Sequence, residues 1–247
     1  MRTCLAKNGV PIPVFYEVNT KDLYLRAVNT IAGEVIVKPV DNAGSRGVSL
    51  ITDKEDFSSV DTAFRYAKEC SRSGGIMVEE YMEGAEVSVE TLSVNGKCHV
   101  IQITDKLTTG VPHFIEMGHN EPSMLPEEVK KKIAEVASAA VKAIGIENDP
   151  SHTEIKVTEE GPKIVELGAR LGGDNITAHL VSFSTGVGMA ECCVRIALTE
   201  EPDLIPKFHR GSAIRYMKTG IGTIKDVLGI EETRAIPGIK EISLVHE

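Results

Sequence analysis

The stretch HTEIKVTEEGPKIVELGARLGGD, residues 152–174, contains two β-like segments, each with a glutamate among its apolar residues. A three-residue turn that ends at Gly161 would fold the stretch into a hairpin, because glycine tolerates the positive φ that such a turn requires. The resulting register places Glu154 directly opposite Glu166. The hairpin is therefore predicted to have one apolar face and one charged face.

The two opposed glutamates need a chemical explanation. Like charges that face each other across two strands are destabilising. A cation between Glu154 and Glu166 removes the conflict, and two carboxylates with phosphate oxygens and water suit Mg²⁺. The other face pairs Ile155 with Val165 and is assigned to the core. An ordinary solvated hairpin face is the alternative interpretation.

A guanidinium and two glycines follow the second glutamate. A strand that only packed a core would have no use for Glu166 and Arg170. Arginine binds carboxylate and phosphate oxygens through several N–H groups. Gly172 and Gly173 allow the backbone to come close to another group. These residues pose the question of which chemistry needs a carboxylate, a guanidinium and two glycines so close together.

A lysine and a glycine-containing loop lie upstream, in VIVKPVDNAGSRGVSL, residues 35–50. Lys38 stands near the end of an apolar strand, and Gly44 and Gly47 fall in the loop after it. Successive N–H groups of such a loop can bind phosphate, and Lys38 can reach the same phosphate as a point charge. The pattern is neither a P-loop nor GxGxxG, and a plain turn is the alternative.

A break between two strands occurs in IMVEEYMEGAEVSVE, residues 76–90. Glu79 and Glu80 end the first strand, and residues 81–85 interrupt it. A connector that lines a cleft can offer backbone N–H and C=O groups to a purine edge, and Glu86 can accept hydrogen bonds from two ribose hydroxyls. A solvated acidic edge is the alternative for these residues.

The composition narrows the class of protein. The chain has 247 residues, 42% of them hydrophobic, and a net charge of -9. The acidic balance disfavours nucleic acid as a partner, and no apolar run is long enough to predict a membrane helix. The start of the chain has no apolar signal sequence. Five cysteines without a CxxC pair indicate a reduced, cytoplasmic protein without structural zinc. Cys192 and Cys193 are assigned to core packing.

Helices and strands alternate, with frequent hairpins, so the predicted fold class is α+β (α/β-like) with antiparallel sheets. Hydrophobic periodicity, caps and turn residues define the elements. Residues 105–125 are polar and are predicted to be one long loop. The other expected elements are a helix from Thr20 to Gly33 with Leu23, Ala27, Val28 and Ile31 on its buried face, a strand at 34–40, helix within 53–72, two strands within 74–94, a strand at 98–104, a helix from Pro126 to Gly145 and a helix near 187–199.

These segments, in this order, resemble the ATP-grasp superfamily. The resemblance covers residues 1–200. It is strongest for the branch of L-amino acid ligases and carnosine-synthase-like enzymes, through HTEIK and ARLGGDNI, and the tail after it resembles biotin-carboxylase-like members. It implies two α/β subdomains that hold ATP between antiparallel sheets. The implied ranges are 1–20 as the remnant of a preceding domain or linker helix, 21–92 as a lid subdomain, 93–205 as a central subdomain and 206–247 as a partial C-terminal segment.

The resemblance also implies roles for matching positions. Lys38 and Arg170 are the implied catalytic residues, acting on the ATP phosphates and on the transferring phosphoryl group. The implied ATP-binding residues are Lys38, Gly44, Ser45, Gly47, Glu79, Glu80, Tyr81, Met82 and Glu86. The implied ligands of Mg²⁺, with Mn²⁺ as an alternative, are Glu154 and Glu166. The implied substrate residues are His119, His152, Arg170, Gly173 and Asp174.

Two departures from the family pattern affect these expectations. Many members carry Asn two residues after the second metal glutamate, where this chain has Gly168, so the number of metal ions stays open. The family also has an N-terminal domain and a phosphate-binding lysine before the helix in which this sequence begins. The chain is therefore expected to be a truncated form, which by itself could be inactive.

The implied function is an ATP- and Mg²⁺-dependent carboxylate–amine ligase that works through an acyl phosphate, on amino acids or similar small carboxylates. Lys106, His113, Glu116 and His119 are further candidates for the substrate side. One alternative is a bicarbonate-activating enzyme, like biotin carboxylase or carbamoyl-phosphate synthase. Another is a nucleotide-binding module without turnover. Small molecules are the expected partners, neither nucleic acid nor membrane is expected, and a homodimer is one expected arrangement.

Overall fold

The computed structural model describes residues 1–111, 114–218, 220 and 222–244. The chain divides into two units, Met1–Tyr216 and Met217–Glu247. The second unit contains one short helix, α7 (Ile230–Arg234), within irregular chain. The first unit contains two antiparallel sheets and is described below.

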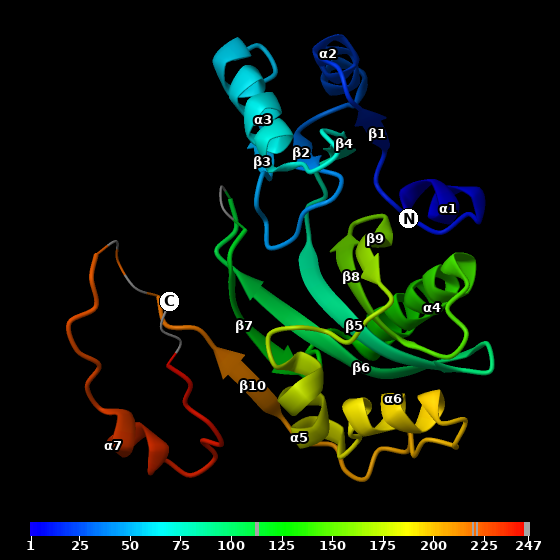
Figure 1. Ribbon diagram of the computed structural model, residues 1–247, viewed down its shortest axis with the longest axis vertical. Helices are drawn as coiled ribbons and strands as arrows, with labels where there is room; N and C mark the ends of the chain where they lie inside the picture. Colours follow the sequence, from blue (N-terminus) through cyan, green and yellow to red (C-terminus); the bar gives the residue numbers. More distant parts are fainter. Residues whose placement is uncertain (112–113, 219, 221, 245–247) are drawn as a thin grey trace. The chain divides into compact units, whose positions relative to one another are not determined.

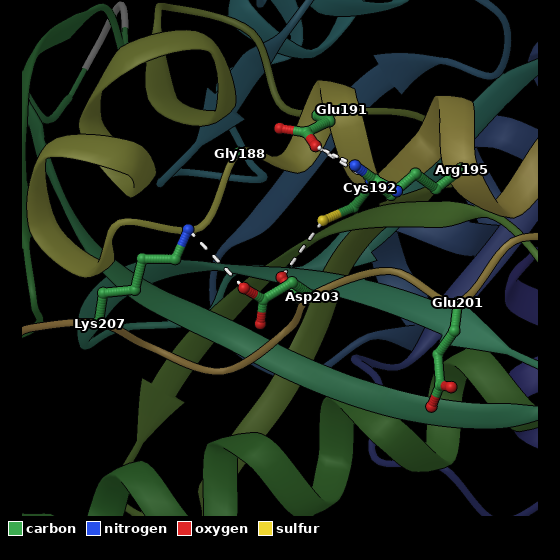
Figure 2. Close-up of a pocket in the computed structure, with 7 residues that line it drawn as sticks. All are labelled: Gly188, Glu191, Cys192, Arg195, Glu201, Asp203 and Lys207. Carbon is green, nitrogen blue, oxygen red and sulfur yellow. Dashed lines mark hydrogen bonds and ion pairs between the residues drawn. The ribbon is translucent and has the colours of Figure 1, made fainter.

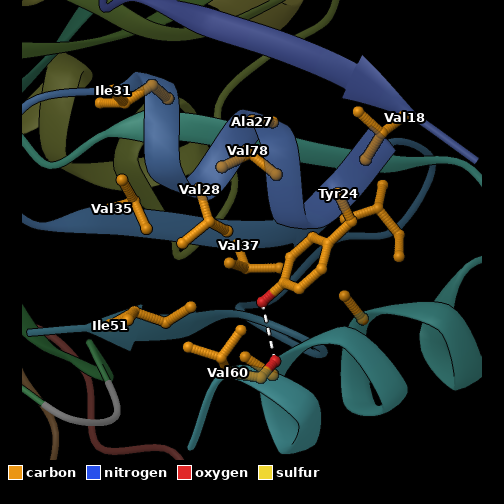
Figure 3. Packing of buried hydrophobic residues seen from close by; sticks show 13 residues of the cluster. Val18, Tyr24, Ala27, Val28, Ile31, Val35, Val37, Ile51, Val60 and Val78 are labelled. Carbon is orange, nitrogen blue, oxygen red and sulfur yellow. Dashed lines mark hydrogen bonds between the residues drawn. The ribbon is translucent and has the colours of Figure 1, made fainter. Parts of the chain in front are cut away.

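The first sheet has four strands in the order β1-β4-β2-β3, and α2 and α3 pack against it (Figure 1). Alternation in β2 buries Val35 and Val37 and leaves Ile36 and Lys38 on the other side. Figure 3 shows the core on the helix side, where the Tyr24 hydroxyl donates a hydrogen bond of 2.8 Å to the Val60 carbonyl. The elements are β1 (Phe15–Val18), α2 (Lys21–Thr30), β2 (Val35–Pro39), β3 (Ser49–Ile51), α3 (Phe57–Cys70) and β4 (Ile76–Glu80).

The predicted helix after Thr20 is confirmed, since the Thr20 side chain accepts a hydrogen bond from the Leu23 N–H. Its predicted buried face is confirmed at Ala27, Val28 and Ile31 and is wrong at Leu23. Tyr24 is fully buried, whereas Leu23 is 45% exposed. Tyr24 can occupy the core because its hydroxyl finds a carbonyl partner there.

The second sheet has six strands in the order β10-β7-β6-β5-β8-β9. Helices α1 and α4 cover one face, where Leu5, Val87 and Ile133 join one buried cluster. Another cluster joins Leu92 to η1, α5 and α6. The elements are α1 (Arg2–Lys7), β5 (Ala85–Val94), β6 (Lys97–Thr108), β7 (Glu116–Glu121), α4 (Glu127–Ile144), β8 (Pro150–Thr158), β9 (Gly161–Gly168), the π-helix η1 (Ile176–Leu180), α5 (Val181–Thr185), α6 (Met189–Ala197) and β10 (Ser212–Arg215).

The expected α+β fold with antiparallel sheets is confirmed, but several boundaries differ from the prediction. Strand β1 pairs within the first sheet, although it falls in the range 1–20, and β5 pairs within the second sheet, although it begins inside 21–92. The chain therefore changes sheet at residues 81–84. Strand β10 pairs with β7, beyond the predicted boundary at 205. The functional division into lid and central subdomains stays a prediction.

The predicted loop at 105–125 is wrong. Strand β6 continues to Thr108, and β7 occupies Glu116–Glu121 between β6 and β10. The sequence of β7, EMGHNE, lacks apolar alternation because its buried positions include His119 and Glu121. A strand that presents polar residues on its inner face has no hydrophobic period to detect.

The hairpin of β8 and β9 has the predicted pairing of Glu154 with Glu166. Its turn is one residue shorter than predicted, and Thr158 pairs with Gly161. A β-bulge at Val165 restores the register, because an extra residue in one strand offsets the shorter turn. Ile164 thereby faces the core instead of Val165.

Two smaller expectations can also be checked. The five cysteines are all free, Cys192 is buried and Cys193 packs against the same cluster, which confirms their assignment to the core. Within the described parts of the chain, no single helix is long and apolar enough to cross a membrane. The segments Ile176–Thr185 and Met189–Ala197 pass the length and composition criteria only as a pair bent by 107°.

Candidate functional site

A cavity of about 620 Å³ lies in the first unit and is lined by residues of both sheets. Most of the residues predicted from the sequence line it, although they come from segments far apart in the chain. These are Lys38, Gly44, Ser45, Glu79, Glu80, Tyr81, Met82, Glu86, His152, Glu154, Glu166, Arg170, Gly173 and Asp174. The tertiary fold therefore brings the predicted nucleotide, metal and substrate residues to one place.

Gly47 is a predicted site residue that does not line the cavity. It is buried, has φ +81°, and a Cβ there would lie 2.7 Å from Cys70 Cβ and 2.9 Å from Pro39 Cδ. Glycine is required because the loop closes tightly against α3 and β2. Its role in the structure is packing, and Gly44 and Ser45 carry the loop into the cavity.

Lys38 is held by a buried ion-pair network. Its Nζ lies 2.7 Å from Glu79 Oε2, and Arg2 Nε lies 2.7 Å from Glu79 Oε1. Burial alone would raise the pKa of Glu79, but the charges of Lys38 and Arg2 outweigh it and lower that pKa. The Glu79 carboxylate pairs with two cations and so orients Lys38. The predicted place of Glu79 along an adenine stays a prediction.

Glu154 and Glu166 face each other across β8 and β9 and both line the cavity. Glu166 is exposed, and no ion pair holds it among the described residues. Two opposed carboxylates next to a cavity form an oxygen donor set that fits Mg²⁺ or Mn²⁺. Gly168 lies opposite His152 and adds no side-chain ligand.

His152 is bound between two carboxylates. Its Nδ1 lies 2.6 Å from Glu90 Oε1, and its Nε2 lies 3.5 Å from Glu154 Oε1. Burial alone would lower the pKa of His152, but hydrogen bonds to Glu154 and Glu90 outweigh this and raise the pKa to about 9. The two carboxylates therefore favour the charged form of His152, which lies between Glu90 and Glu154.

Gly172 packs directly over this buried pair. A Cβ at Gly172 would lie 2.8 Å from Glu90 Oε2 and 2.9 Å from His152 Nδ1. Only glycine allows the chain to pass so close, and the chain then continues to Gly173 and Asp174 in the cavity. Arg170 lines the same cavity with an exposed side chain.

Glu116, His119 and Asp174 form a compact cluster, with one potential ligand atom from each within 4.8 Å of the others. His119 Nε2 lies 3.5 Å from Glu116 Oε2 and 3.9 Å from Asp174 Oδ2. His119 is fully buried and does not line the cavity, whereas both carboxylates do. Burial alone would lower the pKa of His119, but the nearby carboxylates of Asp174 and Glu116 outweigh burial, and the pKa is raised. The cluster presents an acidic surface that can accept a cationic group.

Two aromatic cavity residues, Phe114 and Tyr216, were not predicted from the sequence. Phe114 and Tyr81 have ring centroids 6.3 Å apart, and Tyr216 contacts His119 edge-on at 6.4 Å. Single aromatic residues in irregular segments do not form a pattern that predicts a site. Lys106 and Glu116 were predicted on the substrate side and do line the cavity. His113, predicted with them, lies outside the described residues.

Glu121 on β7 is only 2% exposed and accepts a hydrogen bond of 2.9 Å from Thr104 Oγ1. Burial raises its pKa from the ordinary 4.5 to about 8. Between these pH values the folded protein keeps a proton that the unfolded chain releases. The proton that folded Glu121 retains contributes to the free energy of unfolding. This contribution is complete below pH 4.5 and declines by about 1.4 kcal/mol per pH unit as the pH rises toward 8.

Replacing Glu121 by glutamine is therefore expected to flatten the dependence of stability on pH and to stabilise the protein at pH 8. Urea unfolding at pH 5.5 and pH 8 measures both effects. The exposed Glu135 on α4 provides the control, and Glu135→Gln should leave the pH dependence unchanged. An equal slope for wild type and Glu121→Gln would show that Glu121 is ionised in the folded protein.

A smaller pocket of about 290 Å³ lies beside α6 (Figure 2). Four of its five charged residues are paired with one another, and Glu201 is the fifth. Arg195 contacts Glu191 at 2.9 Å, and Lys207 contacts Asp203 at 3.7 Å. The pocket therefore offers little uncompensated charge to a ligand, and the larger cavity is the candidate site.

Comparison with known proteins agrees with this geometry. A family model described as "ATP-grasp domain" matches residues 31–178. The chain is 32% identical over 211 residues to an alanine–anticapsin ligase of Bacillus subtilis (strain 168), which covers 77% of this chain and 44% of that protein. It is 25% identical over 253 residues to an L-arginine-specific L-amino acid ligase of Bacillus subtilis, which covers 100% of this chain and 60% of that protein.

The crystal structure of an L-amino acid ligase from Bacillus licheniformis superposes with a TM-score of 0.80 and 29% identity, over 97% of this chain and 58% of that one. The chain spans about half the length of the curated relatives it matches. The family model covers more than half of the chain and includes the lysine strand, the glycine loop and the paired glutamates. The protein therefore belongs to the ATP-grasp domain family.

Proposed function

We propose that this chain is the ATP-grasp part of an ATP- and Mg²⁺-dependent carboxylate–amine ligase that acts on amino acids through an acyl phosphate. The observation that carries the proposal is the convergence in one cavity of Lys38, the pair Glu154 and Glu166, and the acidic surface of Glu116 and Asp174. Nucleotide, metal and a cationic amino group can be bound side by side by these three sets of residues.

The nucleotide half of the site consists of residues that suit ATP. Lys38 and the loop with Gly44 and Ser45 line one part of the cavity, and a lysine with exposed N–H groups suits phosphate. Tyr81 provides an aromatic surface for a base. Glu86 is a carboxylate that can accept ribose hydroxyls. Mg²⁺, when held by Glu154 and Glu166, would neutralise phosphate charge and orient the terminal phosphoryl group.

The reaction follows from placing a carboxylate beside the terminal phosphate. A carboxylate oxygen attacks the γ-phosphorus, the bond between that phosphorus and the ADP oxygen breaks, and an acyl phosphate forms. An amine then attacks the acyl carbon, phosphate leaves with the C–O bonding electrons, and the amine loses a proton. Lys38 and Arg170 neutralise charge on the phosphoryl oxygens, and holding the reactants together supplies the proximity advantage.

The acidic cluster favours an amino acid over bicarbonate. A site for bicarbonate needs a surplus of cations around the anion. Here Glu116 already pairs with Lys106, whereas the Asp174 carboxylate is half-exposed in the cavity, 3.9 Å from His119, and suits an ammonium group instead. The carboxylate of the same amino acid would then point toward Arg170 and the phosphoryl group.

The test has two stages. Calorimetry with a non-hydrolysable ATP analogue, with and without Mg²⁺, measures nucleotide binding. Hydroxylamine is then added with ATP, Mg²⁺ and single amino acids, because it converts an acyl phosphate to a stable hydroxamate. We expect Mg²⁺-dependent binding and a hydroxamate for a subset of amino acids. Nucleotide binding with no hydroxamate for any amino acid would assign the chain to the nucleotide-binding modules without turnover. An ATP-dependent reaction with bicarbonate that forms no hydroxamate would assign it to the bicarbonate-activating enzymes.

The proposal includes small-molecule carboxylate and amine substrates and a cytoplasmic setting, where ATP is supplied. Homodimer formation is a separate part of the proposal. Mass measurement in solution decides it, and a mass near 26.7 kDa, that of one chain, would contradict it.

A further inference from the structure

Lys106 on β6 contacts carboxylates from three different strands. Its Nζ lies 3.0 Å from Glu86 Oε1 on β5, 2.7 Å from Glu116 Oε1 on β7 and 2.9 Å from Glu154 Oε1 on β8. The Lys106 side chain is 4% exposed. A buried ammonium has three N–H groups, and here each can be directed to a different carboxylate.

The three carboxylates each have one further cationic neighbour. Lys156 lies 3.1 Å from Glu86, His119 lies 3.5 Å from Glu116, and His152 lies 3.5 Å from Glu154. Among the described residues, Lys106 is the cation that all three share. It is therefore the charge that allows these carboxylates to converge.

The three carboxylates belong to different parts of the proposed site. In the proposed function, Glu86 would bind the ribose, Glu154 the metal ion and Glu116 the substrate amino group. A divalent cation that binds between Glu154 and Glu166 has to share Glu154 with the Lys106 ammonium. Like charges repel at these distances, so the lysine makes Glu154 a poorer ligand until nucleotide phosphates add further negative charge.

We propose that Lys106 is a positioning residue that holds the ribose, metal and amino-group carboxylates at a fixed spacing and prevents tight divalent-cation binding in the absence of nucleotide. This inference rests on the proposed function for the roles of the three carboxylates. Its consequence is an order of binding, because metal enters with the nucleotide and not before it.

Lys106→Met removes the ammonium and keeps most of the side-chain volume. Without their common cation the three carboxylates repel each other, and a divalent cation can take the place of the lost charge. We expect Lys106→Met to bind Mn²⁺ without nucleotide at least about tenfold more tightly than the wild type. ATP-dependent turnover should fall, because the carboxylates no longer keep their spacing.

The experiment is a titration of the full chain with Mn²⁺, in which the electron paramagnetic resonance signal reports free Mn²⁺. No nucleotide and no amino acid are present. Lys106→Arg, which keeps the charge, should bind like the wild type. The matched control is Lys156→Met, since Lys156 lines the same cavity but pairs with Glu86 alone among the three carboxylates. Adding Glu166→Gln to Lys106→Met should abolish the gain and so locate the ion.

Equal Mn²⁺ affinity for Lys106→Met and wild type, or an equal gain in Lys156→Met, would overturn the proposal. So would a gain that survives Glu166→Gln, because the ion would then lie elsewhere. If Lys106→Met does not fold without metal, circular dichroism supplies the readout. Refolding on addition of Mn²⁺ supports the proposal, and failure to refold contradicts it. Since no ligase substrate is present, this result is independent of the hydroxamate assay that tests the proposed function.

Discussion

Replacing Glu166 by glutamine is expected to lower ATP-dependent amide formation by about 10²–10³-fold, the range typical for losing one preorganised electrostatic contact to a reacting group. Glu166 is exposed, lies opposite Glu154 and lines the cavity. The amide is a much weaker ligand for Mg²⁺ than the carboxylate. Binding of an ATP analogue should lose most of its dependence on Mg²⁺, while binding of adenosine should change little.

The same hairpin provides a matched control. Glu159 is exposed at the turn between β8 and β9, and Glu159→Gln makes the same chemical change away from the cavity. Calorimetry at several Mg²⁺ concentrations should separate the two variants. If Glu166→Gln keeps the wild-type Mg²⁺ dependence, then Glu166 is not a metal ligand and the hairpin face is merely solvated.

Arg2→Met is expected to reduce the free energy of unfolding by about 3–5 kcal/mol, the range for breaking a buried ion pair by removing one partner. The Arg2 side chain is 4% exposed and is paired with the Glu79 carboxylate at 2.7 Å. It also donates hydrogen bonds to the carbonyls of Ile164 and Val165 at the bulge of β9. The substitution leaves the buried Glu79 carboxylate with Lys38 as its remaining cation, and it leaves the two carbonyls without this donor.

Urea unfolding followed by circular dichroism measures this loss. Lys7 is exposed on the same short helix, and Lys7→Met should change stability by no more than about 0.5 kcal/mol. The double variant Arg2→Met with Glu79→Gln should recover part of the loss, because the buried carboxylate that has lost one of its two cations is then removed as well. Similar losses for Arg2→Met and Lys7→Met would mean that α1 contributes through packing alone.

The paired glutamates show which structural features a local sequence pattern can predict. The pairing of Glu154 with Glu166 could be predicted because β8 and β9 are joined by a short turn and alternate apolar and polar residues. The turn length was wrong, and the bulge at Val165 compensated for it. A bulge has no sequence signature as strong as alternation, because it needs only one extra residue whose backbone can bend.

The side chains that surround each predicted site residue could not be predicted from the local sequence. Glu79 was expected along an adenine, but its carboxylate is bound by Arg2, which is 77 residues away in the chain. Gly47 was expected at a phosphate, but it packs against Cys70 and Pro39. In both cases the contacting residue comes from another segment of the chain, so a local sequence pattern does not predict the contact.

By itself, the sequence determined the antiparallel α+β fold, the lysine strand, the glycine loop and the opposed glutamates, because strand alternation, caps and turns act over a few residues. Only the tertiary structure decided that Lys106 joins Glu86, Glu116 and Glu154. These four residues lie on four strands whose order in the sheet differs from their order in the chain. Charges from distant segments become neighbours only when the strands pair, so their electrostatic coupling is a property of the folded sheet.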